Sequence, residues 1–212
     1  MLSEEEIVNI NKSAGAGGVM PVQEKGIRPA CAVPYQLYAD GQLSTDKKTV
    51  AIKFTAGSEI FAAKSAGSPF YVYANTGNDL KVRSYAVSAG DSLTDSWTLD
   101  DFAGNNYHIS LYGPNGFFRE FKGGIKDPQV TINIEYSRLK TDKKKLTGNI
   151  EIIAVNNSTG KLNTIVITDN AYKSGNHTLT PGTNSMQANL ILDLSKSFGW
   201  YDFSVFVKGH DN

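Results

Sequence analysis

The chain has 212 residues, which is long enough for one large domain or for two domains of about 100 residues each. Its 21 Lys and Arg residues balance its 21 Asp and Glu residues, so no overall field favours nucleic acid or an anionic membrane as a partner. The single cysteine, Cys31, excludes an intramolecular disulfide, and we interpret it as a small buried core residue.

Residues 1–27 predict a short helix and a linker. Ser3 precedes three glutamates, an arrangement typical of a capped helix start, and the sequence AGAGG at residues 14–18 ends the helix. The segment lacks the basic and then apolar pattern of a secretory signal peptide, so we expect any export signal to lie elsewhere in the parent protein. No apolar run reaches the roughly 18 to 20 residues that span a bilayer.

From residue 28 onward, apolar residues alternate with polar ones, and turn residues interrupt them at short intervals. This pattern predicts many short strands and is typical of a β-sandwich. The predicted strands are residues 49–54, 59–63, 69–74, 81–88, 92–99, 107–112, 117–121, 130–139, 149–155, 163–168, 186–194 and 200–207. The clearest hairpin is predicted at Pro114-Asn115-Gly116, between two aromatic strands.

Three segments recur in the same order along the chain. Residues 70–77 resemble residues 150–160, residues 87–90 resemble residues 179–182, and residues 107–112 resemble residues 201–206. We interpret the recurrence as a duplicated sandwich unit with a boundary near residues 123–128, although any β protein can give such coincidences.

The sequence offers no clear catalytic or metal-binding motif. The histidines His108, His177 and His210 have no second ligand at a metal-binding spacing, and the aspartates of residues 91–101 lack the order of a calcium-binding loop. Nucleophile elbows and phosphate-binding glycine loops are absent from the sequence. The sequence does not decide whether folding brings together Asp and Glu residues as a general acid and base pair. We therefore predict no catalytic residue, no metal and no cofactor in this chain.

Aromatic residues are the remaining candidates for a functional site. Phe117 and Phe118 are adjacent in a strand and point to opposite faces, so one of them is expected to face solvent, where it could enter lipid. The alternative is that one phenylalanine lies in a core and the other packs against a neighbouring domain. We assign Trp97, Trp200 and Tyr201 to the cores, with the Tyr201 hydroxyl at a polar partner.

Four segments carry a resemblance to a known family. They are residues 26–35 (GIRPACAVPY), 112–121 (YGPNGFFREF), 169–172 (DNAY) and 199–205 (GWYDFSV). Together they resemble the tandem C-terminal domains of the bacterial phosphocholine-specific phospholipase C family, over most of residues 20–210. The resemblance implies that the metal ligands and the nucleophile lie in a large preceding domain. Members continue past a Gly-His pair into a polar tail, whereas this chain stops at Asn212, which indicates a trimmed chain or a short variant.

Our hypothesis is an all-β chain with two tandem immunoglobulin-like β-sandwiches, residues 28–124 and 125–212, after the linker of residues 1–27. It would be a non-catalytic module that supports the catalytic domain of a secreted or periplasmic phospholipase C acting on choline phospholipids. Phe117 and Phe118 are the candidates for lipid contact. A carbohydrate-binding sandwich is the second hypothesis and an independent hydrolase is the third, because fold analogy alone does not decide function.

Overall fold

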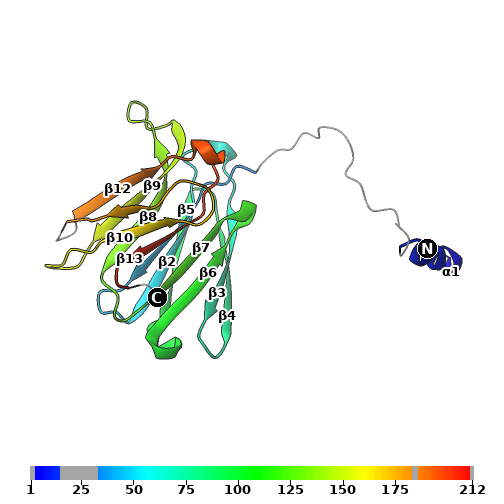
Figure 1. Ribbon diagram of the computed structural model, residues 1–212, viewed down its shortest axis with the longest axis horizontal. Coiled ribbons are helices and arrows are strands. Elements are labelled where there is room, and N and C mark those ends of the chain that lie inside the picture. The colour runs from blue at the N-terminus through cyan, green and yellow to red at the C-terminus, as the bar shows by residue number, and fades with distance from the viewer. Residues whose placement is uncertain (1–2, 15–32, 183–185, 211–212) are drawn as a thin grey trace. The chain divides into compact units, whose positions relative to one another are not determined.

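The computed structural model describes residues 3–14, 33–182 and 186–210 (Figure 1), so Cys31 and most of the predicted linker lie outside the described residues. Residues 1–32 and 33–212 are separate units. In the first, helix α1 (Glu4–Ala14) begins as predicted, because the Ser3 N–H donates to Glu6 Oε2 at 2.7 Å and the Glu6 N–H donates to Ser3 Oγ at 3.3 Å. None of the helices in the described residues is long and apolar enough to cross a membrane.

Residues 33–212 are built mainly from strands, which confirms the predicted β class. The strands are β1 (Leu37–Leu43), β2 (Thr49–Ala56), β3 (Ser68–Asn75), β4 (Leu80–Val87), β5 (Asp91–Thr98), β6 (Asn106–Tyr112), β7 (Phe118–Gly124), β8 (Val130–Arg138), β9 (Leu146–Asn156), β10 (Ile165–Asp169), β11 (His177–Leu179), β12 (Met186–Leu192) and β13 (Phe203–Val207). Short 3-10 helices join some of them: η1 (Ala62–Lys64), η2 (Leu99–Asp101), η3 (Ala103–Asn105), η4 (Pro114–Gly116) and η5 (Ser195–Ser197).

The first seven strands form two antiparallel sheets, in the orders β1-β2-β5 and β4-β3-β6-β7 (Figure 1). Alternate residues of β2 and β3 are buried, as a sheet with one core face requires. Phe54 of β2 joins the two sheets, because its ring lies 5.5 Å from the Phe70 ring of β3 and 4.5 Å from the Tyr85 ring of β4.

The last six strands form two further antiparallel sheets, in the orders β12-β9-β8 and β11-β10-β13. Their apolar residues make a second core cluster, distinct from that of β1–β7. Its fully buried members include Ile152, Ile165, Ile167 and Leu192. In both groups of strands, the second strand lies between the first and the fifth, and the third lies between the fourth and the sixth.

The structure corrects three details of the predicted strands. Residues 59–63, predicted as a strand, form a turn that leads into η1, where the Ile60 N–H donates to the side-chain Oε1 of Gln36 at 2.9 Å. Strands β1 and β11 were not predicted from the sequence. β1 contains Asp40 and Gly41, which are unfavourable for strands, and β11 has only three residues.

The two groups of strands contact each other. The Tyr38 ring of β1 lies 5.5 Å from the Tyr136 ring of β8, in an edge-to-face arrangement. At one end of the contact, Lys47 Nζ donates to the backbone oxygen of Asp127 at 2.9 Å, and at the other, Arg138 pairs with Glu59 at 2.7 Å. Backbone groups and charged side chains thus fasten the two groups near both ends of β8.

Candidate functional site

Phe117 and Phe118 follow the hairpin turn between β6 and β7. The turn has Asn115 at a φ of 57° and Gly116 at a φ of 75°, and the Gly113 N–H donates to the Phe117 oxygen at 2.8 Å, which confirms the predicted hairpin. Phe117 turns inward and packs on the first core, with its ring 6.1 Å from the Phe70 ring. Phe118 is 43% exposed, so the expectation that one of the two faces solvent is confirmed.

Phe118 belongs to an exposed aromatic strip on the outer face of the β4-β3-β6-β7 sheet. Tyr71 of β3 pairs in register with Tyr112 of β6, which in turn pairs with Phe118 of β7. The Tyr112 ring lies 5.0 Å from the Phe118 ring and 5.7 Å from the Tyr73 ring. These four side chains are between 37% and 48% exposed, so the strip is a candidate contact surface.

Phe117 is also connected to the second group of strands through Arg119. The Arg119 Cζ lies 4.8 Å from the centre of the Phe117 ring and 5.8 Å from that of the Tyr201 ring, and its Nη2 donates to the Tyr201 hydroxyl at 3.3 Å. The predicted polar partner of Tyr201 is therefore Arg119. The guanidinium group near both rings positions the start of β7 against the loop that precedes β13.

The tryptophans have different surroundings. Trp97 is 1% exposed, which confirms its assignment to a core, with the Arg83 guanidinium 4.8 Å from its ring centre. Trp200 is 62% exposed, so its assignment to a core is wrong. Trp200 follows Gly199, which has a φ of 84°, in the loop that precedes β13, and a loop residue need not follow the alternation of a strand.

A polar hollow of about 380 Å³ lies where the two groups of strands meet. Lys47, Lys126, Lys161 and His210 line it around Asp127. His210 Nδ1 is 3.4 Å from Asp127 Oδ1, and Asp127 Oδ2 accepts the Gly124 N–H at 2.6 Å. Because Lys47 is held by the Asp127 backbone oxygen and the Asp127 carboxylate accepts the Gly124 N–H beside His210, these groups already serve the contact between the two groups of strands.

The other two histidines each have a hydrogen-bonding partner. His108 Nε2 lies 2.7 Å from Glu120 Oε1, and His177 Nε2 lies 3.0 Å from the Ser174 oxygen. Burial opposes ionisation of Glu120, but its hydrogen bonds from His108 and Lys122 outweigh burial and lower its pKa. Within residues 3–14, 33–182 and 186–210, no group of three or more His, Cys, Asp and Glu side chains could hold a metal ion.

Comparisons with known proteins give one consistent result. Residues 29–124 match the family model described as "Bacterial phospholipase C, C-terminal domain". The chain is 28% identical to the non-hemolytic phospholipase C of Pseudomonas aeruginosa, over 93% of this chain and 27% of that protein. It is 31% identical to the non-hemolytic phospholipase C of Burkholderia pseudomallei, over 88% and 25%, and 31% identical to the hemolytic phospholipase C of Pseudomonas aeruginosa, over 88% and 27%. The chain spans about a quarter of the length of these curated relatives.

Proposed function

Since residues 29–124 belong to the family of bacterial phospholipase C C-terminal domains, we propose that this chain is the C-terminal module of such a phospholipase. In this role it supports a catalytic domain that precedes it in the same polypeptide, and it does not itself cleave lipid. One observation carries the proposal: most of this chain, 88% to 93%, aligns with only about a quarter of each phospholipase C that it resembles. The parent protein would be secreted or periplasmic and would hydrolyse choline phospholipids.

In this proposal, the module consists of two immunoglobulin-like sandwiches, residues 28–124 and 125–212. The shared strand order and the two separate core clusters support it. So do two pairs of recurring segments: residues 107–112 and 201–206 overlap the sixth strand of each group, and residues 87–90 and 179–182 begin at the end of each fourth strand. The remaining pair of segments does not support it, because residues 70–77 overlap the third strand of the first group, whereas residues 150–160 overlap the second strand of the second group.

Within the module, Phe118 is the candidate for direct lipid contact and Phe117 for holding the turn that presents it. Phe118 offers an exposed ring at the start of β7, and burial of a whole phenylalanine side chain contributes about 1.5 to 3 kcal/mol. Phe117 is anchored by Phe70 and Arg119, so it supports the turn from inside.

A sugar-binding role has weaker support at the aromatic strip. Flat stacking on a sugar ring needs aromatic rings that are coplanar and face solvent together. The Tyr73 and Tyr112 rings are inclined at 82°, and the Tyr112 and Phe118 rings at 49°. The strip therefore lacks a flat platform, and the lipid-related function is the better supported of the two.

The test compares the parent phospholipase with and without residues 33–212 on two substrates, phosphatidylcholine vesicles and a soluble phosphocholine ester. We expect removal to slow vesicle hydrolysis more than ester hydrolysis, and the isolated chain to hydrolyse neither substrate. Turnover by the isolated chain, or equal rates with and without the module, would contradict the proposal.

A point variant covers the case in which the shortened enzyme does not fold. Phe118→Ser in the whole enzyme should slow vesicle hydrolysis and leave ester hydrolysis unchanged. The matched control is Leu80→Ser, which removes another exposed apolar side chain, 54% exposed, from the outer face of the same sheet. Equal effects of the two variants on vesicle hydrolysis would show that Phe118 has no specific role in lipid contact.

A further inference from the structure

The loop between β12 and β13 presents two large aromatic side chains to solvent. Phe198 is 94% exposed and Trp200 is 62% exposed. Phe198 has a φ of 55°, a left-handed conformation that is uncommon for a bulky residue. An exposed aromatic residue in an unfavourable backbone conformation gains nothing from the fold, so it points to a function outside the fold.

The loop is held in this conformation by its own hydrogen bonds. Ser197 is buried, and its hydroxyl lies within hydrogen-bonding distance of two backbone oxygens, that of Trp200 at 2.6 Å and that of Leu194 at 3.1 Å. The Gly199 N–H donates to the same Leu194 oxygen at 3.1 Å. The Leu194 N–H in turn donates to Asn149 Oδ1 at 3.0 Å, which fixes the loop beside the start of β9. Phe198 therefore lies on a loop whose conformation is fixed by hydrogen bonds.

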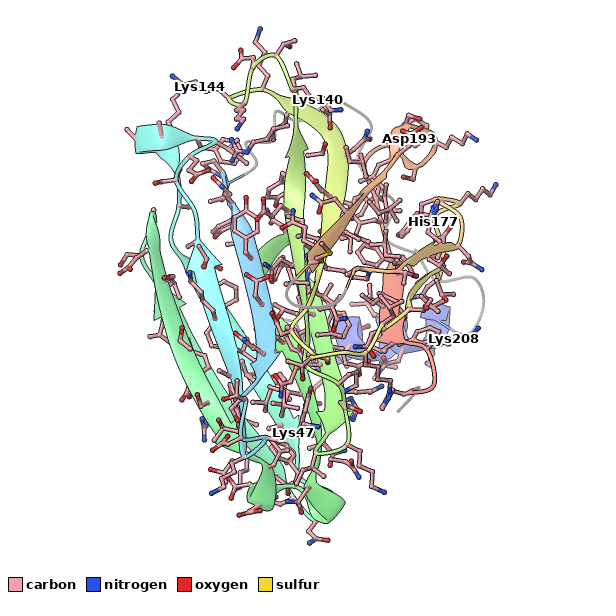
Figure 2. The ribbon with its side chains drawn as sticks, turned by 90° about the vertical axis from the view of Figure 1, so that its left-hand side faces the viewer. Lys47, Lys140, Lys144, His177, Asp193 and Lys208 are labelled. Carbon is pink, nitrogen blue, oxygen red and sulfur yellow. The ribbon has the colours of Figure 1, made fainter. Side chains whose placement is uncertain are left out.

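A lysine-rich hairpin lies at the same end of the molecule. It joins β8 to β9, and Figure 2 shows its Lys140 and Lys144 at the same end as Asp193, with Lys47 at the opposite end. Lys140, Lys143 and Lys144 are exposed, and their ammonium groups form no ion pair with any described residue. Leu139 and Leu146, at the two ends of the hairpin, are 40% and 38% exposed.

A third segment, which contains η1, lies at the same end of the molecule, because its Glu59 forms an ion pair with Arg138 of the hairpin. It adds Phe61, which is 39% exposed, and the exposed Lys64. We call the three segments, residues 59–64, 138–146 and 193–200, the cationic tip. The tip holds seven Lys or Arg residues and three Asp or Glu residues, although the whole chain is neutral. Exposed rings and a local excess of positive charge thus share one end of the β body.

We propose that the cationic tip binds the surface of an anionic phospholipid bilayer, with Phe198 and Trp200 entering the headgroup region and the lysines contacting lipid phosphates. The proposal rests on the function proposed above and names the surface on which the module works. Charge complementarity identifies the occupant, because clustered lysines are attracted to anionic leaflets and aromatic rings favour the membrane interface. The net charge of the whole chain does not reveal this patch, because the Asp and Glu residues that balance its positive charge lie elsewhere in the sequence.

The test is co-sedimentation of the 212-residue chain with vesicles of phosphatidylcholine alone and of phosphatidylcholine mixed with phosphatidylglycerol. We expect binding to the mixed vesicles that weakens with added salt. The triple variant Lys140→Gln, Lys143→Gln, Lys144→Gln should lose roughly fivefold in vesicle partitioning for each lysine. The double variant Phe198→Ser, Trp200→Ser should lose at least roughly tenfold, because two rings no longer leave water.

Two matched controls separate the tip from a general effect of charge or hydrophobicity. Lys48→Gln, Lys126→Gln, Lys161→Gln removes three exposed lysines near Lys47, at the opposite end. Leu162→Ser removes a side chain that is 59% exposed and lies in the loop after β9. Both controls should bind vesicles as the unchanged chain does. Absence of binding to the mixed vesicles, or equal losses in the tip variants and the controls, would overturn the proposal.

The outcomes also distinguish this proposal from the accessory function. If the chain fails to bind vesicles while removal of the module still slows vesicle hydrolysis by the parent enzyme, the tip proposal is wrong and the accessory function stands. If the chain binds vesicles while removal has no effect on hydrolysis, the tip proposal stands and the accessory function is wrong. A tip that contacts another protein domain instead of lipid would give the first result.

Discussion

Asp95 of β5 is the centre of a charged cluster at the edge of the first core. Its Oδ2 accepts hydrogen bonds from the Tyr85 hydroxyl and from Arg83 Nη1 at 2.7 Å. Burial opposes ionisation of Asp95, but the hydrogen bonds from Tyr85, the Ser96 backbone and Arg83 outweigh it and lower the pKa of the carboxyl group. Burial and the neighbouring carboxylate raise the pKa of Tyr85, so the phenol stays a hydrogen-bond donor. The cluster also holds Arg83 against Trp97.

This lowered pKa predicts a pH-dependent contribution to stability. A carboxyl group with a lower pKa in the folded state stabilises the protein above its unfolded pKa of about 3.9, and the contribution is lost as the pH falls through the folded pKa. Asp95→Asn should therefore lower the free energy of unfolding by about 1 kcal/mol at neutral pH, a modest value because the carboxylate is partly exposed. Urea unfolding across pH should show the difference disappearing in acid.

The control for this prediction lies on the same strand. Asp91 accepts the backbone N–H of Ser92 and, unlike Asp95, forms no hydrogen bond or ion pair with another side chain among the described residues. Asp91→Asn should change stability less than Asp95→Asn at neutral pH. A difference between Asp95→Asn and the unchanged protein that persists in acid would contradict the role of the ionised carboxylate.

At the scale of elements, Asn156 fixes the end of β9. It is fully buried, and its Nδ2 donates to the Lys161 oxygen at 2.7 Å and to the Gly182 oxygen at 3.1 Å. Its Oδ1 accepts the Ser158 N–H at 3.1 Å and Asn163 Nδ2 at 2.9 Å. One amide thus satisfies backbone groups from two loops, as buried polar groups require.

Asn156→Ala should destabilise the fold by about 1 to 3 kcal/mol for each buried oxygen that it leaves without a donor. The adjacent Asn157 provides the control, because it is exposed and its side-chain Nδ2 donates to Thr131 Oγ1 at 3.0 Å. Asn157→Ala should cost about 0.5 kcal/mol or less. Thermal unfolding measures both changes, and similar melting temperatures for the two variants would show that the Asn156 network does not hold the loops.

Sequence patterns predicted the strands in which the alternation of apolar residues matches the alternation of buried residues. They failed where a contact with a distant part of the chain determines the local structure. In β2 the alternation of buried residues follows the sequence, so the strand was predicted. In β1, Gly41 looks like a strand breaker, yet a Cβ there would lie 2.6 Å from the Phe121 ring, so the glycine permits close packing against β7. Phe198 and Trp200 were missed as exposed residues because aromatic residues are usually buried, although the glycine between them indicates a loop.

At the scale of the whole β body, the contact between the two groups of strands combines partly buried aromatic and polar side chains. Burial raises the pKa of Tyr136 to about 12, with smaller effects from Tyr201 and Tyr38. Burial likewise raises the pKa of Asp40, against the effect of the nearby Arg119. Gln129 Nε2 also donates across the contact to the Ser44 oxygen at 2.9 Å. Groups withdrawn from water on both sides indicate that the two cores are stabilised together.

The edge-to-face pair of Tyr38 and Tyr136 allows this coupling to be measured. A double-mutant cycle with Tyr38→Ala and Tyr136→Ala should give an interaction energy of about 0.5 to 1.5 kcal/mol. A second cycle, of Tyr38→Ala with Tyr172→Ala, should give additive changes, because no ring contact among the described residues joins those two tyrosines. Urea unfolding supplies the free energies. Additivity in both cycles would mean that the contact between these two rings does not couple the two groups of strands.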